Sequence, residues 1–345
     1  SRTLPEHREI QTRGSRLSDP GSRIVPHSGR FDHADPEAGG NPVELSFLAY
    51  LRGRCRSLPE VPVGIGDDAA VLPEIAGPWL ACTDQVIDGV DFRSDQHRLA
   101  DVGFKSMAIN VSDVAAMGAK PHSALVTLAL PRQDATRIAG EVYEGILEVA
   151  STHAVAIIGG DLSTYDGPLS ISVTMLATLP AGDAWLRSGA REGDAIMVSG
   201  AVGGSLLGRH LRPEPRLELA RRLRECVEVH AAIDISDGLS LDLDRLCAAS
   251  GVGAELDTVR IPIHDDAIRL AESSGRPPME HAWSDGEDFE LILAMSQQDA
   301  DRVGSEVAGV PLTQIGNFVG RTGLWKRMSG KLQRLSPQGY THLGD

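Results

Sequence analysis

Short apolar runs of strand length lead into acidic, glycine-containing turns along this chain, and stretches with helical spacing lie between them. The runs at 61–66, 79–83, 155–158 and 231–233 each reach an aspartate within three residues. Alternation of strands and helices is typical of mixed folds, in which the residues that follow the strands face a cleft. We therefore predict a fold of mixed α and β structure with acidic side chains gathered at one cleft.

The chain has 345 residues, which is enough for two ordinary domains. The segment Pro-Ala-Gly-Asp at 180–183 favours a turn and is a candidate junction. We accordingly expect an N-terminal domain at 43–180 and a C-terminal domain at 181–345. Residues 1–42 are polar and lack a sustained apolar period, so we expect a disordered extension there.

Apolar periodicity predicts the individual elements. Expected helices lie at 44–51, 99–117, 135–150, 205–211, 215–227 and 239–249. Expected strands lie at 61–66, 79–83, 123–130, 155–158, 169–179, 195–199, 231–233, 253–256, 289–294 and 313–318.

Charge and cysteine usage narrow the class of protein. Lys plus Arg number 33 against 48 Asp plus Glu, a formal net charge of −15, which disfavours nucleic acid as a partner. No apolar stretch approaches the ~20 residues of a membrane span, and no secretory signal is present. The four cysteines are scattered without a CxxC pair, as in reduced cytoplasmic proteins. We expect a cytoplasmic protein without a membrane segment.

Several of the acidic turns are candidate metal sites. The adjacent carboxylates of Asp67 and Asp68 repel each other, and a cation would relieve that repulsion, although aspartate is also common in plain turns. Thr83 and Asp84 together offer a hydroxyl and a carboxylate to Mg²⁺. Asp113 stands among small and apolar residues of a predicted helix, where a carboxylate needs a partner.

Two glycine-rich segments are candidate phosphate sites. Gly159 and Gly160 precede Asp161, and glycines let the backbone approach a phosphate, although a tight turn explains them equally simply. The segment 200–204 precedes a predicted helix, where either anion binding or packing would suit it. The chain contains neither a Walker A motif nor a GxGxxG fingerprint.

The segment Asp-Ile-Ser-Asp-Gly at 234–238 is the strongest local signal. Asp237 could simply cap the following helix, but Asp234 at the strand end has no such role. We interpret Asp242 and Asp244 as partners of the helix dipole on a solvated face and exclude them from the site. Arg187, just after the junction, could bind phosphate or form a structural ion pair.

Taken in order, these stretches resemble the thiamine-monophosphate kinase family, of the superfamily that includes aminoimidazole ribonucleotide synthetase and selenide water dikinase. The matching segments are GIGDDAAVL (64–72), TDQVIDGVDF (83–92), NVSDVAAMGA (110–119), GGDLS (159–163), RSGAREGD (187–194), DISDGLSLDL (234–243), GEDFEL (286–291) and GYTHL (339–343). The order and approximate spacing match from about Glu44 onward, which makes the resemblance specific.

The resemblance implies an α+β N-terminal domain that pairs with its twin in a homodimer, and an α/β C-terminal domain. It implies transfer of the γ-phosphoryl group of ATP to thiamine monophosphate. The implied ligands of several Mg²⁺ ions are Asp68, Thr83, Asp84, Asp113, Asp161, Asp234 and Asp237. The implied contacts of the nucleotide phosphates are Gly160, Asp161, Arg187 and Ser236. Arg187 and Asp237 are the expected catalytic residues, and Asp91, Glu287 and Tyr340 are expected on the acceptor side.

The chain departs from the family pattern at two positions. Asp91 stands where the family usually has a substrate-contacting histidine, and Leu343 replaces the aromatic residue of the final motif. A carboxylate near an incoming phosphate adds repulsion. Two alternatives therefore stay open: a related kinase with a different phosphate-bearing acceptor, and a non-catalytic nucleotide-binding protein.

Overall fold

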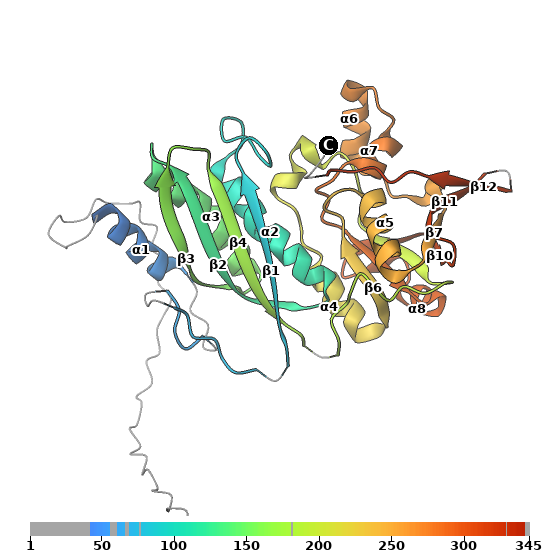
Figure 1. Ribbon diagram of the computed structural model, residues 1–345, viewed down its shortest axis with the longest axis horizontal. Helices are drawn as coiled ribbons and strands as arrows, with labels where there is room; N and C mark the ends of the chain where they lie inside the picture. Colours follow the sequence, from blue (N-terminus) through green and yellow to red (C-terminus); the bar gives the residue numbers. More distant parts are fainter. Residues whose placement is uncertain are drawn as a thin grey trace, which may run out of the picture.

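The computed structural model describes residues 42–55, 61–65, 69–75, 77–180, 182–328 and 330–341 (Figure 1). Residues 1–41 of the predicted extension lie outside the described residues, as do Asp67, Asp68 and Leu343. The predicted boundary between 180 and 181 stays a prediction.

The first half of the chain forms a four-stranded sheet in the order β1-β4-β2-β3. Its strands are β1 (Trp79–Ile87), β2 (Lys120–Pro131), β3 (Ala156–Tyr165) and β4 (Ser170–Thr178). Strands β2 and β3 run parallel, and the other two pairs are antiparallel. The helices α2 (Leu99–Ala116) and α3 (Ala135–Thr152) cover one face of the sheet, and α1 (Pro42–Arg54) packs against α3 (Figure 1).

The two faces of this sheet have different side chains. Cys82, Val126 and Val173 are among the residues that point toward α2 and α3, on what we call the inner face. Thr83, paired with Thr174, points the other way, onto the outer face. Successive strand residues alternate between faces, so neighbouring residues of one strand serve opposite sides of the sheet.

The second half builds a mixed sheet in the order β12-β11-β7-β10-β5-β8-β6, with β9 paired to β10. Its strands are β5 (Ala195–Ser199), β6 (Val229–Asp234), β7 (Gly253–Leu256), β8 (Leu291–Met295), β9 (Glu306–Val307), β10 (Val310–Val319), β11 (Gly323–Met328) and β12 (Lys331–Leu335). Its helices are α4 (Leu217–Cys226), α5 (Leu239–Ser250), α6 (Asp265–Ser274), α7 (Pro278–Ser284) and α8 (Gln297–Val303).

Helix α2 joins the two halves of the molecule (Figure 1). Its last turn buries Ala115 and Ala116 in one apolar cluster with Trp185, Ala232 and Leu291 of the second half. This packing brings the polar residues just before it on α2 to the end of β6.

Most of the predicted elements are confirmed, with informative exceptions. The described residues of the run at 61–66 form isolated bridges, such as the one between Val63 and Val71, and not a strand. The predicted helix at 205–211 is wrong: two 3-10 turns, Ser205–Leu207 and Arg209–Leu211, stand there, interrupted by Gly208 at φ 130°. Helices α6, α7 and α8 and strands β9, β11 and β12 were not anticipated from periodicity.

Two predicted strand ends are also wrong. Thr83 and Asp84 lie within β1, because Gln85, Val86 and Ile87 continue its pairing with β4. The segment 159–161 lies within β3 and does not form a turn. Gly160 permits this, because a Cβ there would lie 1.7 Å from the carbonyl oxygen of Val126 on the neighbouring strand. Among the described residues, no helix is long and apolar enough to cross a membrane.

Candidate active site

Three carboxylates from three distant parts of the chain meet where α2 joins the two halves. Asp84 comes from the inner face of β1, Asp113 from α2 and Asp234 from the end of β6. Asp84 and Asp113 are hydrogen-bonded to each other. The hydroxyl of Ser112 donates to Oδ2 of Asp234 at 2.8 Å. The structure therefore brings together three of the seven predicted metal ligands.

The environment of these carboxylates disfavours their charged forms. Burial raises the pKa of Asp113, and the nearby charges of Asp234 and Asp84 raise it further. Burial likewise raises the pKa of Asp234 and that of Asp84. Like charges at one buried place are stable only when they share protons or bind a cation.

A cavity of about 330 Å³ opens beside Asp113 and Asp234. Arg187 lines it from the second half of the molecule, and its positive charge opposes the raised pKa values of both carboxyls. The remaining wall is mostly apolar and comes from β1, α2, β4 and β6: Leu80, Ala81, Cys82, Val114, Ala116, Met117, Met175, Ala177, Ala232 and Ile233. The cavity thus joins an apolar wall to a polar end of mixed charge.

The carboxylates of Asp84, Asp113 and Asp234 suit a hard cation that also binds water or phosphate oxygens. Within the part of the chain that the structure describes, no group of three or more His, Cys, Asp or Glu side chains is arranged to hold a metal alone. Mg²⁺ is commonly bound by one or two carboxylates, with water and phosphate oxygens completing its octahedron. The carboxylates of Asp84, Asp113 and Asp234 fit that kind of binding.

The turn after β6 is held by a residue that the sequence analysis excluded. The Oδ2 atom of Asp242 accepts from the backbone N–H groups of Ser236, Asp237 and Gly238, at 3.1, 2.9 and 3.1 Å. The prediction that Asp242 lies on a solvated face is wrong, since it is 1% exposed. Arg245 bridges Asp237 and Asp242. Asp242 therefore fixes the shape of the turn that carries Ser236 and Asp237.

A buried lysine that sequence reasoning missed lies beside two of the predicted acceptor-side residues, Asp91 and Glu287. Lys105 of α2 is 1% exposed, and its Nζ lies 2.5 Å from Oε1 of Glu287 and 3.0 Å from the carbonyl oxygen of Asp91. The ion pair joins the two halves of the molecule. Burial raises the pKa of Glu287, and Lys105 opposes that shift. A lone lysine on an apolar helix was the available signal.

The other two predicted acceptor-side residues lie nearby. Oδ2 of Asp91 accepts from the N–H of Ile87 at 2.8 Å, so this carboxylate closes a local turn. The charge of Asp91 is close enough to raise the pKa of Glu287. The N–H of Tyr340 donates to the carbonyl oxygen of Asp237 at 2.9 Å, and Tyr340 is half exposed.

Asp161 and Thr83 lie apart from the three carboxylates. Asp161 is paired with Thr127 of β2, whose alternation places both on the outer face of the sheet. The hydroxyl of Thr83 donates to the carbonyl oxygen of Val173 at 3.0 Å, also on that face. Within the described part of one chain, Asp161 and Thr83 therefore do not share a site with Asp84, Asp113 and Asp234.

The glycine-rich segment 200–204 serves packing, one of the two readings of its sequence. The N–H of Gly203 donates to both carboxylate oxygens of Asp288, at 3.0 and 2.9 Å, and that of Gly204 to Asp285 at 3.2 Å. The N–H groups of Gly200 and Val202 donate to backbone carbonyls. These donors are therefore used within the protein.

His210 gives the stability of the protein a measurable pH dependence. It is 5% exposed, its Nδ1 lies 3.0 Å from the carbonyl oxygen of Ser205, and burial lowers its pKa to about 4. The unfolded chain, with an ordinary histidine pKa near 6.5, then binds the proton more tightly. We expect stability to be full above about pH 6.5 and to fall toward pH 4. His210→Asn, which keeps a donor for Ser205, should weaken this fall in denaturation experiments. An identical acid limb would contradict this account.

Comparison with known proteins defines first a class and then a family. The model of the AIR synthase related protein, N-terminal domain, matches residues 66–179, and that of the C-terminal domain matches residues 185–325. The thiamine-monophosphate kinase of Rhodopirellula baltica is 62% identical over 311 residues, covering 87% of this chain and 97% of that protein. This chain belongs to the thiamine-monophosphate kinase family.

Two solved structures have a fold similar to that of this chain. The crystal structure of thiamine-monophosphate kinase from Stenotrophomonas maltophilia has a TM-score of 0.70 at 33% identity, covering 81% of this chain and 94% of that one. AaThiL complexed with AMPPCP and TMP has a TM-score of 0.69 at 28% identity, covering 87% and 97%.

Proposed function

We propose that this protein transfers the γ-phosphoryl group of ATP to the phosphate of thiamine monophosphate, giving thiamine diphosphate and ADP. The observation that carries the proposal is the meeting of Asp113 and Asp234 with Arg187 at one cavity, with Asp84 close enough to Asp113 to raise its pKa, in a member of this family. A relative of the same fold was solved with an ATP analogue and TMP together.

The reaction must bring two anions together, and the site is built for that task. At ~4 Å each pair of unit charges repels by roughly 1 kcal/mol even in bulk water. Bound Mg²⁺ would neutralise phosphate charge and orient the transferred group. Arg187 and Ser236 contact the nucleotide phosphates, and Arg187 also offsets charge that develops during transfer. The acceptor phosphate is itself the nucleophile, so transfer is direct and in line, without a general base or a covalent enzyme intermediate.

The proposed metal ligands form two sets. Asp113 and Asp234 serve ions at the cavity together with the neighbouring Asp84, and Asp237 lies close enough to Glu287 for its charge to act on that carboxyl. Thr83 and Asp161, with Gly160 beside them, serve a separate position on the outer face of the sheet. Asp68 is proposed from its motif alone, since it lies outside the described residues.

The protein is proposed to act as a homodimer in the cytoplasm. The outer face of the first sheet exposes Leu125 at 38%, in a row with Thr83 and Thr174, and it is the face opposite α2 and α3. A second copy packed there would cover it. The cysteines at 55, 82, 226 and 247 are free thiols, as the reducing cytoplasm maintains them.

ADP release tests the function directly. We expect rapid release that requires both thiamine monophosphate and Mg²⁺ and stops in EDTA. Slow release that ignores thiamine monophosphate would favour the related kinase with another acceptor. Nucleotide binding without turnover on any phosphate-bearing acceptor would favour the non-catalytic alternative.

Asp91 provides a test of acceptor identity. Because its carboxylate already accepts from Ile87, Asp91→Asn keeps an acceptor oxygen and should leave the KM for thiamine monophosphate within about threefold. Asp91→His restores the usual residue of the family. Clearly improved use of thiamine monophosphate by either variant would show that Asp91 repels the acceptor, and so would support divergence toward another substrate.

A further inference from the structure

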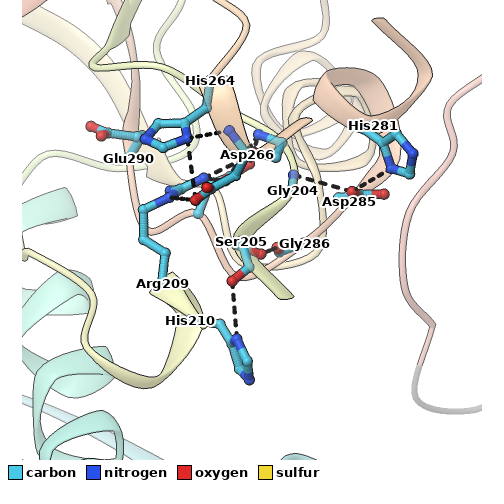
Figure 2. Close-up of polar contacts among 12 residues, drawn as sticks. Gly204, Ser205, Arg209, His210, His264, Asp266, His281, Asp285, Gly286 and Glu290 are labelled. Carbon is cyan, nitrogen blue, oxygen red and sulfur yellow. Dashed lines mark hydrogen bonds and ion pairs between the residues drawn. The ribbon is translucent and has the colours of Figure 1, made fainter. Parts of the chain in front are cut away.

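Three side chains outside the carboxylate group form a continuous hydrogen-bonded chain, and Figure 2 shows its inner part. His281 is 2% exposed; its Nδ1 lies 2.8 Å from Oδ2 of Asp285, and its Nε2 lies 2.7 Å from Oγ of Ser274. A carboxylate accepts, so the N–H at Nδ1 donates to Asp285, and Nε2 pairs with the hydroxyl of Ser274. We call these residues the Ser274–His281–Asp285 relay.

The relay ends at the segment that carries Glu287. Oδ2 of Asp285 also accepts from the N–H of Gly204 at 3.2 Å, and the hydroxyl of Ser205 donates to the carbonyl oxygen of Gly286 at 2.6 Å (Figure 2). The two residues immediately before Glu287 are therefore held by His281, by the glycine-rich turn and by Arg276, whose Nη1 lies 3.4 Å from Oδ1 of Asp285.

This segment needs to be held, because its backbone is strained. Glu287 has φ of 60° and Phe289 has φ of 53°, in the left-handed region that non-glycine residues rarely adopt. Each such residue costs about 1–3 kcal/mol and persists only where its surroundings enforce it. Glu287 differs from the acidic residues around it, since its carboxylate reaches Lys105 of the first half of the molecule. Its placement depends on the backbone beside Asp285.

We propose that His281 is a positioning residue: through Asp285 it fixes the backbone that aims Glu287 at the acceptor. The inference rests on the proposed function, in which Glu287 lies on the acceptor side. The nucleotide-side carboxylates Asp84, Asp113 and Asp234 come from other elements, β1, α2 and β6. The relay segment reaches this side at the carbonyl oxygen of Ser236, which accepts from the N–H of Glu287 at 2.7 Å.

The same three residue types make hydrolytic triads, but the surroundings of Ser274 differ from those of a nucleophile. A triad serine faces backbone N–H groups that await an oxyanion. The nearby N–H of Arg276 instead donates to Oγ of Ser274 itself, at 3.2 Å. The hydroxyl is thus the outer end of a structural chain.

Two conservative variants separate the two links of His281. His281→Asn keeps a donor at the place of Nδ1 and loses the link to Ser274, whereas His281→Gln keeps a polar group at the place of Nε2 and loses the donor to Asp285. We expect His281→Gln to raise the KM for thiamine monophosphate roughly tenfold or more while the KM for ATP stays within about twofold. His281→Asn and the control Ser274→Ala should stay within about threefold of the wild type in both constants.

The variant Glu287→Gln tests whether Glu287 itself contributes to binding of the acceptor. It should raise the acceptor KM at least as much as His281→Gln, and the double variant should be no worse than Glu287→Gln alone, because coupled residues are not additive. If Glu287→Gln leaves the acceptor KM unchanged, the proposed role of Glu287 fails and the inference fails with it. If Glu287→Gln raises it and His281→Gln does not, only the inference fails. Parallel rises in both KM values of His281→Gln, or labelling of Ser274 by a fluorophosphonate, would also overturn it.

Discussion

Asp113→Asn is expected to lose two to three orders of magnitude in kcat while the protein without ligands becomes more stable. Activity falls because the variant removes a charge that the site uses to hold cations against phosphate. Stability rises because burial and the charges of Asp234 and Asp84 raise the pKa of Asp113, so its ionised form is disfavoured in the folded state. At pH 8 the gain in unfolding free energy should be at least about 1 kcal/mol, the equivalent of one pKa unit.

The raised pKa of Asp113 also predicts the direction in which stability changes with pH. A carboxyl with a raised pKa in the folded state contributes stability below about pH 4 that is lost as pH rises toward 8. The wild type without ligands should therefore lose stability over that window, and Asp113→Asn should lose less. Ser106→Ala, which removes a buried hydroxyl bonded within α2 itself, is the control for packing. Equal or lower stability of Asp113→Asn at pH 8 would refute the idea of repelling carboxylates.

Lys105→Met is expected to destabilise the protein by about 3 kcal/mol or more, because it leaves the carboxylate of Glu287 without its partner. Methionine fills similar space, so the loss should reflect charge and not a cavity. Burial already raises the pKa of Glu287, and loss of the ammonium would raise it further. The defect should thus be smaller near pH 5, where Glu287 can take up a proton, and larger at pH 8.

A double variant checks the cause. Lys105→Met combined with Glu287→Gln should recover most of the lost unfolding free energy at pH 8 in urea titrations, since both charges are then absent. It should not recover acceptor use, which the proposed function assigns to Glu287. Additive destabilisation by the two substitutions would show that Lys105 acts mainly through packing.

The sequence was most informative where a charge stood in apolar surroundings. Asp113 and Asp234 were identified in that way, and the structure places them together although 121 positions separate them. Lys105 carries the same signal, a charge on an otherwise apolar helix, and was not among the predicted residues. Asp242 was misjudged, because a carboxylate in the first turn of a helix looks alike whether it faces solvent or binds three N–H groups of the preceding turn.

The apolar pattern within one segment could not predict on which face of the sheet a strand residue lies. Gly159 and Gly160 resemble a turn, and only the neighbouring carbonyl of Val126 explains why the strand continues through them. A continued strand, with its shifted register at this point, places Asp161 on the outer face, away from Asp84. That outcome depends on which strand lies alongside, a nonlocal fact that periodicity within one segment does not contain.

The most direct test of the central claim is the binding of Mn²⁺, followed by electron paramagnetic resonance, with and without AMPPCP. We expect weak binding to the protein alone, and additional tight binding when the analogue is present, because the carboxylates and the phosphates supply ligands together. Asp113→Asn and Asp234→Asn should each lose the part of that binding which exceeds binding to free AMPPCP. Unchanged Mn²⁺ binding in both variants would contradict a cation site built from Asp84, Asp113 and Asp234.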